Sequence, residues 1–257
     1  MMRHFVKMLG IISIVLAYLL VSCGIMILPA GARLRRNFLA RNCSFASRRL
    51  LALLGIRMHV RHPERLQGRS SGALVVSNHV SYIDILVIAS LAPSVFITSV
   101  ELGSTPFLGM LARLGGSVFV ERRKAFGLKK EIAAITRILE EGFTVVLFPE
   151  GTTSNGERVR PFKNSLFDSA VDARTNILPL CLRYTKINNC PVTAHNRDTV
   201  FYYGGETFSR HFPKLLALES VDIEAMPLKI IKAPAHASRK ELALEAHAAI
   251  STAYSAE

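Results

Sequence analysis

Short apolar runs bounded by turn residues alternate along the chain with stretches in which apolar positions recur at helical spacing. The run Ala73 to Val76 lies between Ser70-Ser71-Gly72 and Ser77-Asn78, a pattern typical of a buried strand. From Tyr82 or Ile83 to Leu91 the spacing becomes helical, and Ser81 is the expected N-cap. By the same criteria we predict further strands at 95–100, 117–120, 143–148, 177–183, 199–203 and 225–231, and further helices at 105–114, 124–141, 161–173 and 239–254. This alternation predicts an α/β fold from about residue 66 to the end, with a single mixed sheet flanked by helices.

An apolar segment without charges precedes this domain. Met8 to Leu28 is long enough to cross about 30 Å of hydrocarbon as a helix. Arg3 and Lys7 lie before it, and six arginines follow it: Arg33, Arg35, Arg36, Arg41, Arg48 and Arg49. Because cytoplasmic flanks carry the excess of basic residues, we predict that the C-terminal side faces the cytoplasm and that a short N-terminal tail lies outside. A buried core helix is the alternative interpretation of the same run.

The net charge of +13 is concentrated in the same region. Residues 1–70 hold twelve Lys and Arg residues and one acid, Glu64, so this segment carries +11 of the total. A basic strip beside a membrane helix attracts anionic lipid headgroups, and residues 38–56 have the mixed apolar and arginine positions of an interfacial helix. We therefore predict a membrane anchor and basic interfacial segment at 1–65, with a spanning helix at about 8–28, and one α/β domain at 66–257.

A cleaved leader competes for these residues. Leu20-Val21-Ser22-Cys23 resembles a bacterial lipoprotein cleavage box. The apolar run continues beyond it and a dense arginine cluster follows, which opposes export. The four cysteines are scattered, and Cys181 and Cys190 lack metal-ligand spacing, so neither a disulfide framework nor a metal site is predicted. We expect an uncleaved anchor, a cytoplasmic catalytic face and, for a bacterial chain, location at the inner membrane.

The first candidate for catalysis is the segment Asn78-His79-Val80-Ser81-Tyr82-Ile83-Asp84. His79 follows the predicted strand, and Asp84 lies in the first turn of the helix, where the helix dipole favours an anion. A loop histidine can fold back over such an aspartate, which accepts one ring N–H and leaves the other nitrogen free to take a proton. The pair is therefore a candidate dyad for activating a hydroxyl, and a purely structural histidine–carboxylate contact is the alternative.

Two further strand ends carry polar residues that suit a phosphate. Glu121-Arg122-Arg123-Lys124 follows one strand, at the position where α/β sheets present ligands, and arginine there can bind phosphate bidentately. Pro149-Glu150-Gly151-Thr152-Thr153-Ser154 follows the next, and its glycine, hydroxyls and free N–H groups can line an anion pocket. Arg158, Arg160 and Lys163 lie within reach. A solvated charge run and an ordinary turn are the structural alternatives.

Four blocks in order resemble those of the glycerolipid acyltransferases, and most closely the lysophosphatidic acid (1-acylglycerol-3-phosphate) acyltransferases. The blocks are Asn78 to Asp84, Gly116 to Arg122, Phe148 to Ser154 and Ile177 to Leu180. The resemblance spans residues 70–185, and the ordered set is far more specific than any single block. The second block has Val120 and Glu121 where isoleucine and aspartate are also seen, which preserves size and charge.

The resemblance implies a role for each matching residue. His79 would be the general base and Asp84 its orienting partner, while Arg122, Glu150 and Gly151 would help bind the glycerol phosphate. Thr152 and Lys163 complete the predicted substrate-binding set, and Pro179 would shape the acyl or acceptor pocket. The implied reaction moves an acyl chain from acyl-CoA or acyl carrier protein to 1-acylglycerol-3-phosphate and forms phosphatidic acid. No cofactor or metal is expected, and the implied partners are membrane lipids, the lysophospholipid acceptor and the acyl donor.

Other functions fit parts of the sequence. Lyso-ornithine lipid acyltransferases share the four blocks, so that lipid or another lysophospholipid is an alternative acceptor. A non-catalytic, membrane-tethered lipid-binding protein would use the same basic residues without turnover. Gly68-Arg69-Ser70-Ser71-Gly72 matches G-x-S-x-G, but a nucleophile elbow follows a strand and this one precedes it. A sequence pI of 10.0 suggests nucleic-acid binding, yet the charge belongs to the anchor and no basic stripe with interleaved aromatics follows.

Overall fold

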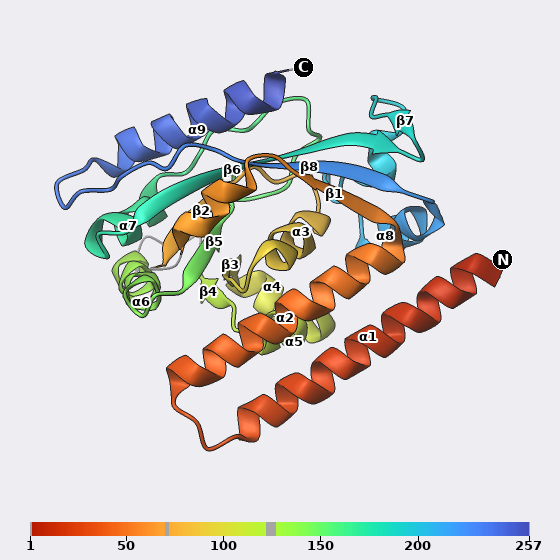
Figure 1. The fold of residues 1–257 in the computed structure, drawn as a ribbon, viewed down its shortest axis with the longest axis horizontal. Helices are drawn as coiled ribbons and strands as arrows, with labels where there is room; N and C mark the ends of the chain where they lie inside the picture. Colours follow the sequence, from red (N-terminus) through yellow and green to blue (C-terminus); the bar gives the residue numbers. More distant parts are fainter. Residues whose placement is uncertain (1, 70–71, 122–126, 257) are drawn as a thin grey trace.

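A sheet of eight strands forms the centre of the computed structural model, which describes residues 2–69, 72–121 and 127–256 (Figure 1). The strand order is β1-β8-β6-β2-β5-β3-β4, with β7 added to β6. The strands are β1 (Ile56–Val60), β2 (Ala73–Ser77), β3 (Val95–Ser99), β4 (Val118–Val120), β5 (Thr144–Leu147), β6 (Asn176–Ile187), β7 (Cys190–Pro191) and β8 (Val221–Pro227). Since β8 is antiparallel to β6 and the central strands are parallel, the predicted mixed sheet is confirmed.

The parallel register of the central strands decides where their ends meet. Val76 of β2 pairs with Leu147 of β5 and with Pro179 of β6. The segments that leave β2 and β5 therefore emerge side by side at the carboxyl edge of the sheet, the edge where open α/β sheets bind ligands. The first and third blocks of the sequence begin at this edge.

Helices cover both faces of the sheet (Figure 1). They are α1 (Met2–Ile27), α2 (Ala32–Leu54), α3 (Ile83–Leu91), α4 (Val100–Gly103), α5 (Pro106–Leu114), α6 (Leu128–Glu140), α7 (Asp168–Asp172), α8 (Phe208–Ala217) and α9 (Arg239–Ser255), with 3₁₀ turns at Pro63–Arg69, Ser165–Phe167 and Arg197–Thr199. Successive strand residues point to opposite faces. Val75 accordingly packs in the core with α2, α3 and α8, whereas Leu74 and Val76 pack in the core with α6, α7 and α9.

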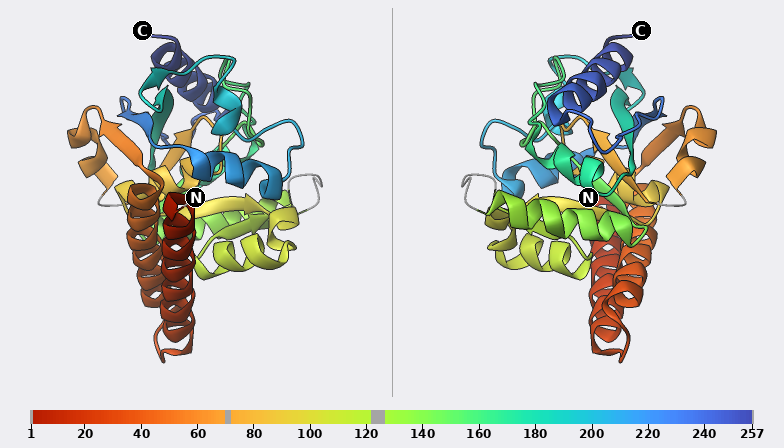
Figure 2. Two further views of the ribbon diagram at one scale, coloured as in Figure 1. Left: turned by 90° about the vertical axis from the view of Figure 1, so that its right-hand side faces the viewer. Right: turned by 90° about the vertical axis from the view of Figure 1, so that its left-hand side faces the viewer.

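The two N-terminal helices form an antiparallel hairpin whose tip projects away from the sheet (Figure 2). Within the described part of the chain, α1 meets the length and composition of a membrane-spanning helix, and large apolar side chains on it are exposed to solvent. Its N-terminal end is nevertheless held on the α/β part, because Arg3 pairs with Glu219 at 2.7 Å and the Lys7 ammonium donates to the carbonyl of Leu218 at 2.7 Å. In this fold the N-terminal tail lies beside the α/β part, whereas the predicted topology puts it across the membrane from that domain. The orientation of the chain relative to a membrane stays a prediction, because the charge of the flanking segments does not record that the chain folds back.

Several predicted boundaries differ from the structure. The helix predicted at 38–56 begins at Ala32, buries Leu51 and Leu54 against the domain, and ends where Gly55 adopts a φ of 78°. Residues 56–60 then form β1 and pair with β8, so part of the segment before the predicted boundary at 65/66 belongs to the sheet. The division into an anchor and an acyltransferase domain is otherwise untested and stays a prediction.

One predicted element is wrong and two are displaced. The helix predicted at 161–173 begins later, as the 3₁₀ turn Ser165–Phe167 followed by α7, because Lys163 donates its backbone N–H to the carbonyl of Pro149 at the end of β5. Residues 199–203 are not a strand, since Phe201 bonds back to Arg197 and Tyr202 donates to the carbonyl of Val80. The strand predicted at 225–231 runs from Val221 to Pro227 instead.

Candidate active site

His79 and Asp84 meet as the sequence predicts. Nδ1 of His79 lies 2.9 Å from Oδ2 of Asp84, and the same oxygen accepts the backbone N–H groups of Val80 at 2.8 Å and Ser81 at 2.9 Å. Because an ionised carboxylate only accepts hydrogen bonds, Nδ1 carries the proton, and the neutral ring leaves Nε2 as the basic nitrogen. The Asp84 side chain is fully buried, whereas the ring of His79 is 15% exposed and open to a substrate.

The segment between β2 and α3 is anchored to β6 on its buried side. The Asn78 amide donates to the carbonyl of Leu182 and accepts the N–H of the same residue, both at 2.9 Å, so it imitates a strand partner. Two residues further along β6, the hydroxyl of Tyr184 donates to Oδ1 of Asp84 at 2.7 Å. Sequence reasoning missed Tyr184, because the fourth block ends at Leu180 and no local signal marks a contact between strands so distant in sequence.

Phe148 supports the imidazole from another side. Its ring stacks on that of His79, with 4.0 Å between centroids and 16° between planes. Phe148 follows β5 directly, so the third block supplies a flat apolar surface that limits rotation of the histidine.

Glu150 is buried, and backbone N–H groups face both of its carboxylate oxygens. Oε1 accepts the N–H of His79 at 2.8 Å, and Oε2 accepts that of Arg160 at 3.1 Å. Desolvation raises the pKa of the Glu150 carboxyl to about 7, although the two N–H donors favour the ionised form. The structure places the Glu150 carboxylate between two loops of the site, and the substrate contact predicted for it stays a prediction.

The other residues predicted for the site lie in different surroundings. Gly151 has a φ of 77°, and the Lys163 side chain covers it so closely that an added Cβ would lie 3.0 Å from Nζ. Thr152 is exposed beside them. Pro179 is buried in β6, where it pairs with β2. Arg122 lies outside the described residues, as does part of the G-x-S-x-G match.

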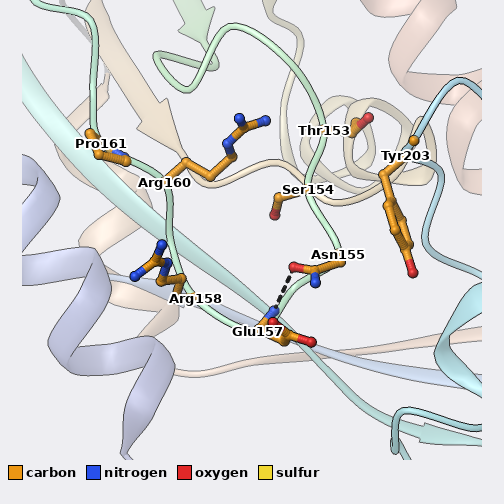
Figure 3. Close-up of a pocket in the computed structure, with 9 residues that line it drawn as sticks. Thr153, Ser154, Asn155, Glu157, Arg158, Arg160, Pro161 and Tyr203 are labelled. Carbon is orange, nitrogen blue, oxygen red and sulfur yellow. Dashed lines mark hydrogen bonds between the residues drawn. The ribbon is translucent and has the colours of Figure 1, made fainter.

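A cavity of about 550 Å³ lies at the loop that follows the third block (Figure 3). Its lining comprises Thr153, Ser154, Asn155, Glu157, Arg158, Arg160, Pro161, Tyr203 and Gly204. It adjoins the first block, because Ser154 donates its backbone N–H to the carbonyl of His79 at 3.0 Å. The guanidinium groups of Arg158 and Arg160 are exposed and make no hydrogen bond or ion pair within the described residues.

The residues predicted from the sequence account for only part of this cavity. Arg158 and Arg160 can be predicted from the sequence, because both closely follow the third block. Tyr203 cannot, because it reaches the cavity from the separate segment after the 3₁₀ turn Arg197–Thr199 (Figure 3). No cluster of three or more His, Cys, Asp or Glu side chains suited to a metal ion occurs in the part of the chain that the structure describes.

A histidine with a buried carboxylate partner, on a loop bonded to the lining of a cationic cavity at the carboxyl edge of an α/β sheet, is an arrangement that can take a proton from an acceptor. The profile of the family described as Acyltransferase matches residues 57–183. A lyso-ornithine lipid O-acyltransferase from Rhodobacter capsulatus is 30% identical over 211 residues, which cover 78% of this chain and 71% of that protein. The chain belongs to the acyltransferase family.

Two further relatives and a solved structure extend the comparison. The chain is 36% identical to a lyso-ornithine lipid O-acyltransferase from Rhizobium meliloti over 74% of its length and 66% of the relative. It is 38% identical to a 1-acyl-sn-glycerol-3-phosphate acyltransferase from Neisseria meningitidis over 53% of each chain. The crystal structure of a 1-acyl-sn-glycerophosphate acyltransferase from Thermotoga maritima shares the fold, with a TM-score of 0.70 at 18% identity over 98% of this chain and 95% of that one. The matches to the first two relatives thus span between about half and two thirds of their lengths.

Proposed function

We propose that this protein transfers an acyl chain from a thioester donor to the free hydroxyl of 1-acylglycerol-3-phosphate and so forms phosphatidic acid. The observation that carries the proposal is the His79–Asp84 pair. It leaves Nε2 of a partly exposed ring free of the Asp84 contact, on a loop bonded to the lining of a cavity whose Arg158 and Arg160 guanidinium groups have no partner among the described residues.

The chemistry follows from this geometry. The acceptor hydroxyl loses its proton to Nε2 of His79 as its oxygen attacks the thioester carbonyl, and Asp84 stabilises the imidazolium that forms. The C–S bond of the tetrahedral intermediate then breaks, and the departing thiolate takes the proton from the imidazolium. The products are an ester and a free thiol, so the transfer is direct and needs no covalent acyl-enzyme.

The cavity suits the headgroup of the acceptor. A phosphate monoester carries up to two negative charges, and guanidinium groups bind it through paired N–H donors. Arg158 and Arg160 supply such donors next to the loop that holds His79, so a bound phosphate brings the adjacent glycerol hydroxyl toward the base. Fixing the acceptor in this way supplies rate in addition to proton transfer.

Lyso-ornithine lipid is the second candidate acceptor, and the extent of similarity favours it. The two lyso-ornithine lipid acyltransferases described above match 74% and 78% of this chain, against 53% for the glycerophosphate acyltransferase. The cavity also contains Glu157, which pairs with Arg197 at 2.9 Å. A lining with both signs of charge is compatible with a headgroup that carries a carboxylate and an amine.

The donor and the setting complete the proposal. Acyl-CoA or acyl carrier protein would bring the acyl chain, and both lipid substrates would reach the site from a membrane. The apolar, largely exposed helix α1 supports membrane association. We place the catalytic domain on the cytoplasmic face of the inner membrane.

A parallel acceptor assay tests the assignment. Detergent-solubilised protein receives labelled acyl-CoA with either 1-acylglycerol-3-phosphate or lyso-ornithine lipid, and diacylated product is separated and counted. We expect faster labelling of phosphatidic acid. Faster labelling with lyso-ornithine lipid would change the assigned acceptor but not the proposed acyl-transfer reaction. If neither lipid were labelled, with acyl carrier protein tried as a second donor, the proposed function would be contradicted.

A further inference from the structure

The oxygens of Asp84 are held from two different parts of the fold. Oδ2 faces its own loop and accepts His79 Nδ1 and the N–H groups of Val80 and Ser81. Oδ1 faces β6, and the hydroxyl of Tyr184 donates to it at 2.7 Å. The carboxylate therefore has donors on both oxygens, and a single side chain from outside the loop supplies the donor on Oδ1.

The position of Tyr184 follows from the overshoot of β6 past β2. The parallel pairing ends where Ser77 meets Leu180, and β6 continues to Ile187. Leu178, Leu180, Leu182 and Tyr184 alternate onto one face of the strand and pack in one core. Beyond the end of β2 these four side chains face the segment 78–84. The last of them, Tyr184, carries a hydroxyl where the three leucines are apolar.

We propose that Tyr184 is a positioning residue for acyl transfer, because its hydroxyl holds Oδ1 of Asp84 so that Oδ2 stays aligned with Nδ1 of His79. This inference rests on the proposed function for its consequence in catalysis. A carboxylate that is hydrogen-bonded at one oxygen can rotate about its Cβ–Cγ bond. A carboxylate that is hydrogen-bonded at both oxygens cannot rotate without breaking a buried hydrogen bond. Nε2 then keeps a constant direction toward the cavity.

Two features keep this hydroxyl in the role of donor. Burial, together with the charge of Asp84, raises the pKa of Tyr184 well above its usual value, so the proton stays on the hydroxyl. Its ring is only 5% exposed and meets that of Phe201 edge-on at 5.2 Å between centroids, which limits movement.

The test replaces the hydroxyl alone. Tyr184→Phe is compared with Tyr18→Phe, which removes a buried hydroxyl that donates to the carbonyl of Leu111 on α5, away from the dyad. In acyl-transfer assays we expect Tyr184→Phe to lower kcat about 10-fold while the acceptor KM stays within about 2-fold. Tyr18→Phe should keep the parent kcat. In an Asp84→Asn background the effect of Tyr184→Phe should largely disappear, since both changes act on one contact.

A second measurement does not depend on activity. In protein labelled with ¹⁵N-histidine and shown by thermal unfolding to be folded, the Nδ1–H proton of His79 is followed by NMR. We expect its exchange with water to be about 10-fold faster in Tyr184→Phe than in the parent and in Tyr18→Phe. Exchange at the parent rate would overturn the inference, as would additive effects of Tyr184→Phe and Asp84→Asn on kcat. A parent protein without transferase activity would contradict the proposed function, and the exchange rate alone would then decide the role of Tyr184 in the alignment.

Discussion

The Glu150 carboxylate accepts the backbone N–H of His79 at 2.8 Å, although 71 positions separate the two residues in the sequence. Ser154 closes the same junction in the opposite direction, by donating its N–H to the His79 carbonyl. The first and third blocks are therefore joined to each other through the main chain of His79. Changes in the third block should accordingly alter the base as well as any bound acceptor.

The raised pKa of Glu150 predicts a pH-dependent stability. The folded pKa of about 7 exceeds the ordinary value of 4.5, so the folded state binds a proton more tightly than the unfolded state. The contribution of Glu150 to stability is then complete below about pH 4.5 and is lost as pH rises toward 7, at no more than about 1 kcal/mol per pH unit. The measurement is the free energy of unfolding of the parent and of Glu150→Gln across this range.

Glu150→Gln should remove that slope. Glutamine keeps one oxygen acceptor but faces the second N–H with an amide nitrogen, so we also expect lower stability at acidic pH, by about 1–3 kcal/mol. Parallel curves for the two proteins between pH 4.5 and 7 would show that Glu150 does not titrate as described.

Asp84→Asn removes the carboxylate charge while keeping the tautomer of His79. The amide oxygen can occupy the Oδ2 position, where the N–H groups of Val80 and Ser81 hold it, and still accept the proton of Nδ1. The amide nitrogen then stands in place of Oδ1 and cannot accept the proton of the Tyr184 hydroxyl, so both the charge that stabilises the imidazolium and this contact are lost. We expect kcat to fall about 100-fold with little change in the acceptor KM, and steady-state kinetics on purified protein measure both. An unchanged kcat would mean that the carboxylate charge plays no part in the reaction.

Arg160 should govern acceptor binding. Its guanidinium lines the cavity without a partner in the described structure, so Arg160→Ala should lower kcat/KM for 1-acylglycerol-3-phosphate about 10-fold, through weaker binding and poorer placement of the acceptor. Added salt should weaken acceptor binding by the parent protein until it approaches that of the variant, because salt screens exposed charges. Arg210→Ala is the matched control, since Arg210 is an exposed arginine on α8 outside the cavity lining. Equal changes in both variants would exclude a local role.

Gly156 is a test of the loop that lines the cavity. Its φ is 72°, and an added Cβ would lie 2.3 Å from the ring of Phe201. Gly204 has a φ of 69° but nothing within 4 Å of the same position. Both alanine variants should lose about 1 kcal/mol of unfolding free energy because of the left-handed backbone. Gly156→Ala should lose about 1–3 kcal/mol more because its Cβ overlaps the ring of Phe201. Denaturant unfolding measures the difference in unfolding free energy between the two variants. Equal stabilities would show that the loop moves away from Phe201 without cost.

The parts of the fold that the sequence predicts are those in which local pattern and tertiary environment agree. β2, β3 and β5 are apolar runs bounded by turn residues and are buried on both faces, so their pattern allows no other element. The His79–Asp84 pair is predictable because the loop that joins them is short. The same conditions fail at 161–164, where a helical composition is overridden by the backbone bond from Lys163 to Pro149.

The missing parts of the site depend on distant contacts. Tyr184 reaches Asp84 because β6 continues past β2, and Tyr203 reaches the cavity because Tyr202 bonds to the first block at Val80. Neither relation leaves a period or a motif in the sequence. The position of the N-terminal end of α1 beside the α/β part is not predicted for a similar reason, since the contacts of Arg3 and Lys7 with the turn after α8 are long-range.

The central claim is that His79 takes the proton of the acceptor hydroxyl during acyl transfer. The most direct measurement is the rate at which labelled acyl chain enters diacyl lipid with purified parent, His79→Ala and, as a control, His236→Ala, whose histidine is exposed and remote in sequence from the four blocks. Thermal unfolding of each protein establishes that it is folded. We predict a loss of about 10²- to 10⁴-fold for His79→Ala, and parent activity for His236→Ala. Acyl transfer at the parent rate by folded His79→Ala protein would contradict the account.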